Sequence, residues 1–188
     1  MTDSHVSTAR GTRRSGVTVA GVGAGVGAST VAAALGVADR GIFVGRPVDV
    51  LVCAATGDSL VRAGYAAQLV TAWSGRRPVV AVTAAAAGGQ SRPVAARLRL
   101  LEPHTTGVVV LPFVRRWREL AAPPLEIRDL LRLPLTDQPR GVRGYATALA
   151  EVRAVLDLRS PAAARHTPWR AAPTFASTPA ALAAGSSR

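Results

Sequence analysis

Four glycines alternate through the segment Gly21–Thr30, between an apolar run and a run of small residues that favours a helix. The apolar run is Val17–Ala20 and the helix-like run is Val31–Leu35. A strand, a glycine loop and a helix in this order bring backbone N–H groups and the positive end of the helix dipole to one point. The sequence therefore predicts a β-loop-α unit that can hold a phosphate or another anion at the loop.

This loop has the shape of the phosphate-binding P-loop, but it lacks the lysine of that motif. Ala28 stands where the pattern G-x-x-x-x-G-K-[ST] requires Lys, and Ser29 follows at the hydroxyl position. All 23 basic residues are Arg, so no other lysine can take its place. The sequence indicates a nucleotide-binding ancestry and argues against nucleotide chemistry. The residues expected to contact a phosphate are Gly23, Gly25, Val26, Gly27, Ala28, Ser29 and Thr30.

The chain is expected to form one domain with a tail at each end. Its 188 residues are 48% hydrophobic and only 4% aromatic, which predicts a core built mostly from Ala, Val and Leu. Residues 1–15 are polar and basic without periodicity, and Pro, Ala, Ser and Arg dominate residues 159–188. We expect both tails to be disordered and residues 16–158 to form the folded domain.

Short apolar runs alternate with helical patterns along this domain. Strands are expected at residues 17–22, 41–44, 48–55, 79–82 and 107–111, and helices at residues 29–38, 58–73, 93–101, 125–133 and 144–158, with a helical turn at 115–120. This alternation predicts a three-layer α/β fold, with a mostly parallel sheet and helices on both faces.

Within this sheet we expect strand 17–22 to be central, and Asp58 to be the N-cap of its helix. The glycine loop, residues 56–58 and residues 112–116 should meet at the carboxyl edge, where ligands lie in such sheets.

Three segments, taken in order, resemble the MinD/ParA ATPases. Residues 23–30 resemble the deviant Walker A loop of that family, K-G-G-x-G-K-[ST]-[ST]. Residues 48–60 are similar to the family strand that leads into a Thr-containing loop and a helix, and residues 108–119 resemble its late strand that ends in Pro. The loop and the later Leu-Pro-Phe-Val also resemble an uncharacterised group of short MinD-like proteins from high-GC bacteria. This resemblance, over residues 17–135, implies a P-loop NTPase-like α/β fold.

Several positions depart from the family pattern. Gly23 and Ala28 occupy the places of the two lysines that reach phosphates, one of them on the partner subunit. The acidic residues of the family have no counterpart, because Gly45 and Arg46 follow the second expected strand. Ser29 is the only matching metal-side group. The resemblance therefore implies a degenerate site with at most weak binding of ATP or ADP with Mg²⁺.

Two other interpretations of the loop stay open. Gly23-x-Gly25-x-x-Ala28 fits the dinucleotide fingerprint, and Arg46 could meet a 2′-phosphate, which would describe a small NADP-binding oxidoreductase. Alternatively, the glycine loop is a purely structural turn between a strand and a helix and binds no ligand.

The net charge of +12 predicts attraction to nucleic acid, anionic lipid or an acidic partner. Arg115, Arg116 and Arg118 flank Trp117, an arrangement that suits a protein partner or nucleic acid stacked on the indole. The structural alternative, which we favour, packs Trp117 into the core and leaves the arginines solvated. A basic nucleic-acid-binding adaptor on an inert fold is the alternative function.

The remaining features concern location and mode of action. Cys53, the single cysteine, lies in an apolar run and is expected to be a buried hydrophobe. Arg13-Arg14 precede the uncharged residues 15–38, so a twin-arginine export signal remains an alternative. The alternating glycines disfavour a membrane-spanning helix there. We expect a cytoplasmic protein without a membrane span that acts by binding a protein partner, with a homodimer left open. The resemblance implies plasmid or mobile-element maintenance or transfer, with weak or no nucleotide hydrolysis.

Overall fold

The computed structural model describes residues 16–120 and 122–158. Five strands form one sheet in the order β2-β1-β3-β4-β5, and every neighbouring pair is parallel. The strands are β1 (Thr18–Gly21), β2 (Ala38–Ile42), β3 (Val50–Ala54), β4 (Val79–Thr83) and β5 (Gly107–Leu111). The expectations for residues 1–15 and 159–188 lie outside the described residues.

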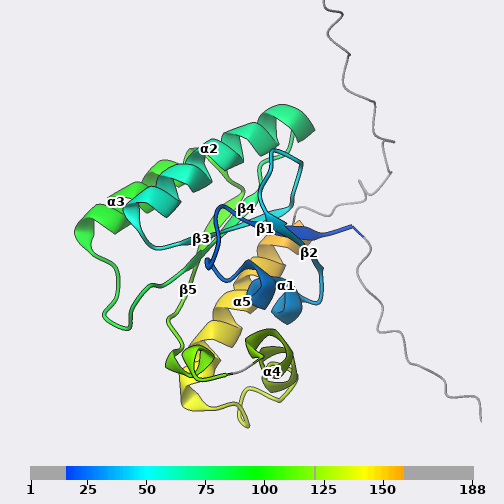
Figure 1. The fold of residues 1–188 in the computed structure, drawn as a ribbon, viewed down its shortest axis with the longest axis vertical. Coiled ribbons are helices and arrows are strands. Elements are labelled where there is room, and N and C mark those ends of the chain that lie inside the picture. Colours follow the sequence, from blue (N-terminus) through cyan, green and yellow to red (C-terminus); the bar gives the residue numbers. More distant parts are fainter. Residues whose placement is uncertain (1–15, 121, 159–188) are drawn as a thin grey trace, which may run out of the picture.

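Helices cover both faces of this sheet. On one face lie α1 (Ala28–Leu35), α4 (Pro123–Leu130) and α5 (Arg140–Leu158), and on the other lie α2 (Gly57–Ser74) and α3 (Arg92–Leu101) (Figure 1). Two short 3-10 helices, η1 (Glu102–His104) and η2 (Arg115–Arg118), follow α3 and β5. The arrangement confirms the expected three-layer α/β fold with a parallel sheet.

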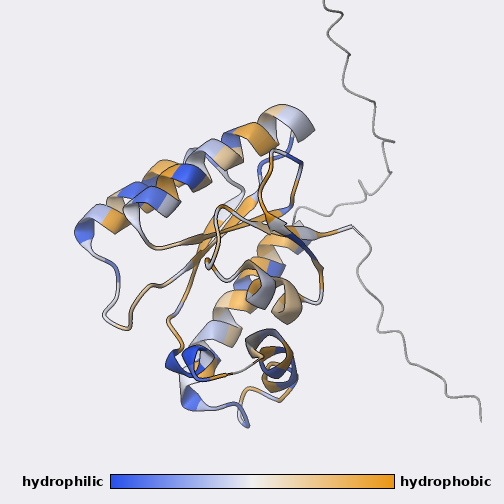
Figure 2. Cartoon of the chain, in the orientation of Figure 1, coloured by the Kyte–Doolittle hydropathy of each residue, from blue (hydrophilic) through white to orange (hydrophobic). Residues whose placement is uncertain are grey.

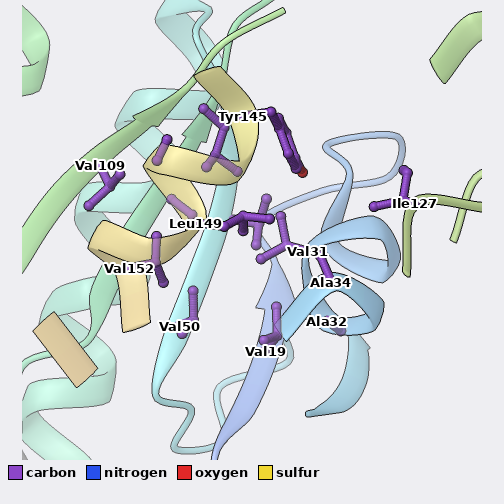
Figure 3. Close-up of a cluster of buried hydrophobic side chains, with 14 of the residues drawn as sticks. Val19, Val31, Ala32, Ala34, Val50, Val109, Ile127, Tyr145, Leu149 and Val152 are labelled. Atoms are coloured by element: carbon purple, nitrogen blue, oxygen red, sulfur yellow. The ribbon is translucent and has the colours of Figure 1, made fainter. Parts of the chain in front are cut away.

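Alternate residues of the strands pack into two separate cores, one on each face of the sheet. The strands between the two helical layers are mostly hydrophobic (Figure 2). Val50 of β3 packs with the helices α1 and α5, whereas its neighbour Leu51 packs with α2 and α3. Figure 3 shows Val31 of α1 and Leu149 of α5 pointing toward each other in the first of these cores. Because both faces are buried, the strands are nearly continuous apolar runs, which is why the sequence pattern located most of them.

The connection from β2 to β3 is an extended strap, defined here as residues 43–49, and it contains no helix. Crossovers between parallel strands usually need about a dozen residues or more. The strap spans β1, because the Phe43 N–H donates to the Gly21 carbonyl (2.7 Å) and the Asp49 N–H donates to the Thr18 carbonyl (3.1 Å). Phe43 also packs against the core under α2. The strap therefore covers β1 where longer crossovers place a helix.

Three expectations about the sheet and its first long helix are wrong. The central strand is β3, because the chain passes back over β1 after β2. The second strand occupies residues 38–42 and not 41–44. Asp58 is not an N-cap: α2 starts at Gly57 after Thr56, and the Asp58 carboxylate pairs with Arg62 one turn later (3.0 Å).

Helix ends differ from the expected ones where glycine or local packing decides them. α1 ends at Leu35 because Gly36 adopts a left-handed conformation (φ 68°) and caps the helix. α5 begins at Arg140, one turn before the expected start at Gly144. Among the helices that the structure describes, none combines the length and the apolar character needed to cross a bilayer.

Candidate anion site at the glycine loop

The glycine loop connects the end of β1 at Gly21 to the start of α1 at Ala28. Gly25 (φ 71°) and Gly27 (φ 86°) both adopt left-handed backbone conformations that residues with a Cβ rarely take. Gly27 is also the N-cap of α1, with no side chain to bond the first turn. These two glycines turn the chain sharply enough to bring the helix N-terminus to the carboxyl edge of the sheet.

Val26 anchors the loop between these two glycines. Its side chain is buried in the core under α1 and α5, so only its backbone can meet a ligand. The Thr83 hydroxyl, at the end of β4, lies 3.1 Å from the Val26 carbonyl oxygen and 3.2 Å from the Cys53 carbonyl oxygen. A Cβ on Gly21 would lie 2.8 Å from Val26 Cγ2, so Gly21 makes room for the anchor.

The first turn of α1 presents backbone donors at this edge. Helical hydrogen bonding begins with the Val31 N–H, which donates to the Gly27 carbonyl (3.0 Å). The amides of Ala28, Ser29 and Thr30 precede that bond, so they remain available to an anion. The Ser29 side chain is exposed at the same end of the helix.

Two arginines supply positive charge close to the loop. Arg62 of α2 reaches it, since a Cβ on Gly23 would lie 3.9 Å from Arg62 Nη1. Arg97 of α3 lies over the start of α2, 3.3 Å (Nη1) from a Cβ built on Gly57. Arg62 also pairs with Asp58, whereas no ion pair among the described residues involves Arg97. Arg62 therefore brings a guanidinium group beside Gly23, and Arg97 adds a second one over the start of α2.

Acidic residues are sparse around the loop. Asp49 lies at the opposite, amino edge of the sheet, where its carboxylate accepts the Thr18 N–H (3.0 Å) and hydroxyl (3.2 Å). Within residues 16–120 and 122–158, no group of three or more His, Cys, Asp or Glu side chains gathers as a metal site would. Ser29 is the residue through which Mg²⁺ binding at this loop can be tested.

The arginine-rich segment after β5 starts at the same carboxyl edge, and its Val114 is buried in the core cluster that contains Val26. Trp117 packs edge-on against Tyr145 of α5, with ring centroids 5.6 Å apart and planes at 85°. Arg115 pairs with Glu119 (3.4 Å), and the Arg118 guanidinium lies 4.9 Å from the centroid of the Phe113 ring. β5 is separated from β1 by β3 and β4. Residues 112–118 therefore belong with α5, as the structural interpretation of Trp117 expects.

Arg46, which the dinucleotide interpretation assigned to a 2′-phosphate, lies in the strap. It lines a groove of about 1200 Å³ together with Arg40, Ser74 and Arg76. Ser74 is the last residue of α2 and Arg76 follows it, at the amino edge of the sheet. None of the described residues that line this groove comes from the glycine loop.

The sequence analysis missed Arg62, Thr83 and Arg97. The Arg62 signal was its spacing of four residues from Asp58 on one helix, and the Thr83 signal was its position at the end of an apolar strand. Arg97 was visible only as one arginine among several. The loop, its Thr83 anchor and the Arg62 guanidinium lie together at the carboxyl edge of the sheet. Comparison of the chain with protein-family models, curated proteins and solved structures finds no match.

Proposed function

We propose that this protein is a phosphate- or nucleotide-binding module that acts through binding, with weak or no hydrolysis. One observation carries the proposal: the glycine loop and the free amides of α1 lie beside Arg62 at the carboxyl edge of β1. β2 and β3 flank β1 on opposite sides, so this edge is the switch point where doubly wound sheets bind their ligands. The resemblance of the loop to the deviant Walker A motif supports the same proposal.

The charge at the loop suits binding better than phosphoryl transfer. Hydrolysis needs cations placed to offset the charge that develops on the phosphate. Arg62 is exposed and shares its charge with Asp58. Helix-end charge effects are worth only about 0.3–1 kcal/mol at an exposed site. Together these terms hold an anion loosely and leave turnover without its usual electrostatic support.

The direct test is calorimetric titration with ATP, ADP, GTP and NADPH, with and without Mg²⁺. We expect weak binding of the nucleoside phosphates, and no ATP hydrolysis above background. Gly27→Val should abolish binding because it strains the left-handed N-cap, and Arg62→Ala should weaken it. Ala28→Lys should tighten binding without restoring turnover. Arg115→Ala, which removes an exposed arginine paired with Glu119 as Arg62 is with Asp58, is the matched control for lost charge.

Two outcomes would contradict this proposal. Hydrolysis by the natural chain that Ser29→Ala removes would show a working metal site. Binding of NADPH alone, with no affinity for ATP or ADP, would favour the oxidoreductase interpretation.

The wider role that we propose follows from the family resemblance and not from the site itself. A degenerate MinD/ParA-like protein that cannot cycle its nucleotide would act in the cytoplasm by binding a protein partner. Plasmid or mobile-element maintenance or transfer is the process in which we place it.

A second candidate function is a basic nucleic-acid-binding adaptor. The observation that favours it is the exposure of Arg115 and Arg116, which project from η2 while Trp117 packs inward. Nucleic acid binding through this segment would be electrostatic and would not involve stacking on the indole.

A further inference from the structure

Large apolar side chains occupy every fourth position along the exposed side of α2. We call these residues the α2 ridge, and they are Val61 (48% exposed), Tyr65 (66%), Leu69 (46%) and Trp73 (57%). The opposite side of the helix is buried against the sheet. Figure 2 shows the resulting alternation of hydrophobic and hydrophilic segments along α2. Single exposed apolar residues are ordinary, but a contiguous row marks an interaction surface.

A hollow lies beside the α2 ridge. It has a volume of about 340 Å³ between α2 and α3, and its lining includes Val61, Tyr65 and Leu100. Leu100 of α3 is itself highly exposed. The surface therefore offers both protruding aromatic rings and a recess whose apolar walls are interrupted by Gln68, Arg97 and His104. Aromatic side chains that fill such recesses account for much of the binding energy at protein interfaces.

We propose that the α2 ridge is a homodimer interface, in which two copies of α2 pack antiparallel about a two-fold axis. A row at four-residue spacing on one helix packs against a row at three-residue spacing on the other at a crossing of about 20°, which keeps the two helices close along their length. A two-fold interface brings the same patch of both copies together. In the register centred between Tyr65 and Leu69, Tyr65 meets Leu69 of the second copy. Val61 then meets Trp73 of the second copy, which lies next to the hollow.

Charge complementarity favours the same register. It places Asp58, at the start of one α2, opposite Arg76 of the second copy, just beyond the end of the other α2. Both side chains are exposed, and no ion pair among the described residues involves Arg76. Asp58 already pairs with Arg62 one turn along its own helix (3.0 Å), so in the dimer its carboxylate would lie between Arg62 and Arg76 of the second copy. A second copy therefore offers Arg76 a carboxylate.

The exposed area is enough for a small interface. An aromatic side chain presents about 200 Å², so the exposed parts of Tyr65 and Trp73 would bury roughly 250 Å² per copy. The aliphatic residues of the ridge and Leu100 add to this. The sum approaches the roughly 500 Å² per copy at which specific interfaces begin. A dimer of micromolar affinity is the expected result.

The test is sedimentation velocity of the full chain, from low micromolar to submillimolar concentration at physiological salt, which screens the net positive charge. We expect a monomer–dimer equilibrium. Tyr65→Glu and Trp73→Ala should each weaken dimerisation at least about tenfold, the effect of losing a side chain at the centre of an interface. Leu135→Glu replaces an equally exposed leucine away from α2, and it should dimerise like the natural chain. Circular dichroism checks that each variant is folded.

A charge swap tests the register. Asp58→Arg and Arg76→Asp should each weaken the dimer, and the double variant should recover affinity. A chain that stays monomeric at every concentration would overturn the proposal, including one that instead binds anionic vesicles or an acidic protein through the ridge. A dimer that tolerates both Tyr65→Glu and Trp73→Ala would overturn it equally. Gly27→Val, which disables the anion site, should dimerise normally, so failure of one proposal is distinguishable from failure of the other.

Discussion

The glycines of the loop answer to different physical constraints. Gly25 and Gly27 need their positive φ angles, and Gly21 needs to lack a Cβ because Val26 Cγ2 would lie 2.8 Å away. Gly23 has neither constraint, since the nearest atom to a Cβ there belongs to the flexible end of Arg62. Gly21, Gly25 and Gly27 are therefore needed for the fold of the loop. The space beside Gly23 is open toward the Arg62 guanidinium, so there the missing side chain leaves room for a ligand.

At the same scale, the fully buried Cys53 predicts a pH dependence of stability. Burial raises the pKa of its thiol to about 12 from an ordinary value of 9.0. The unfolded chain then loses this proton at lower pH than the folded chain does. The free energy of unfolding is therefore at its full value below about pH 9 and falls as pH rises toward 12. Urea unfolding of the natural chain should show this decline, and Cys53→Ala should show less of it.

The residual decline in Cys53→Ala has a second source. Burial also raises the pKa of the Tyr145 phenol, which titrates in the same direction from a higher starting pH.

A thiol reagent should leave Cys53 unmodified in the folded protein, since the thiolate is the reactive form. Rapid modification without unfolding would show that β3 opens.

At the scale of elements, α1 depends on its neighbours for stability. Isolated helices of its length are unstable in water, and its N-cap, Gly27, offers no side-chain hydrogen bond. Its C-terminal end is bonded by α5: the Arg153 guanidinium donates to the Ala34 carbonyl (2.7 Å) across the core face. Val31 and Ala32 add buried contacts. The helix that presents the anion site is therefore held in place by packing and by a charge from the last helix.

This dependence predicts that Arg153→Ala destabilises the protein by about 1 kcal/mol, the value of a charge-assisted hydrogen bond at a helix C-terminus. Arg153→Lys should recover part of the loss. Arg99→Ala removes an exposed arginine from the last turn of α3 and should cost little. Denaturant midpoints measure all three. Equal losses for Arg153→Ala and Arg99→Ala would show that the bond to Ala34 contributes nothing.

At the scale of the whole molecule, an excess of arginine surrounds a core that is apolar on both faces. The net charge is +12 over the full sequence, and the four ion pairs found among the described residues involve exposed side chains. Exposed pairs of this kind add little stability. Arg40, Arg46 and Arg76 line the large groove along the strap, and Arg115 and Arg116 project from η2. Positive charge is thus spread over several faces.

Such a distribution predicts weak, sequence-independent binding to DNA that fades as salt rises, because binding releases condensed counterions. Fluorescence anisotropy with labelled duplexes of unrelated sequence, at low and physiological salt, measures it. Arg115→Ala with Arg116→Ala should lower affinity and reduce the salt dependence by about one per lost phosphate contact. Tight binding that selects a sequence, or that barely responds to salt, would show a recognition element beyond charge.

Local sequence alone predicted the β-loop-α unit, the buried strands and the three-layer fold. Val50–Ala54 and Val79–Thr83 are continuous apolar runs, and such runs indicate strands buried on both faces whatever their neighbours are. Gly27 before Ala28–Leu35 likewise marks a helix start through short-range geometry. The sequence alone also showed that Ala28 stands at the position where a working P-loop has its lysine.

Only the tertiary structure decided which strand is central, how β2 joins β3, and which cations reach the loop. The hydroxyl that holds Val26 comes from Thr83, 57 residues later, and Arg62 approaches Gly23 from another helix. Hydrophobic periodicity encodes which face of an element is buried, but not which distant element covers it. Strand order and the site's electrostatics therefore emerge only when the sheet is assembled.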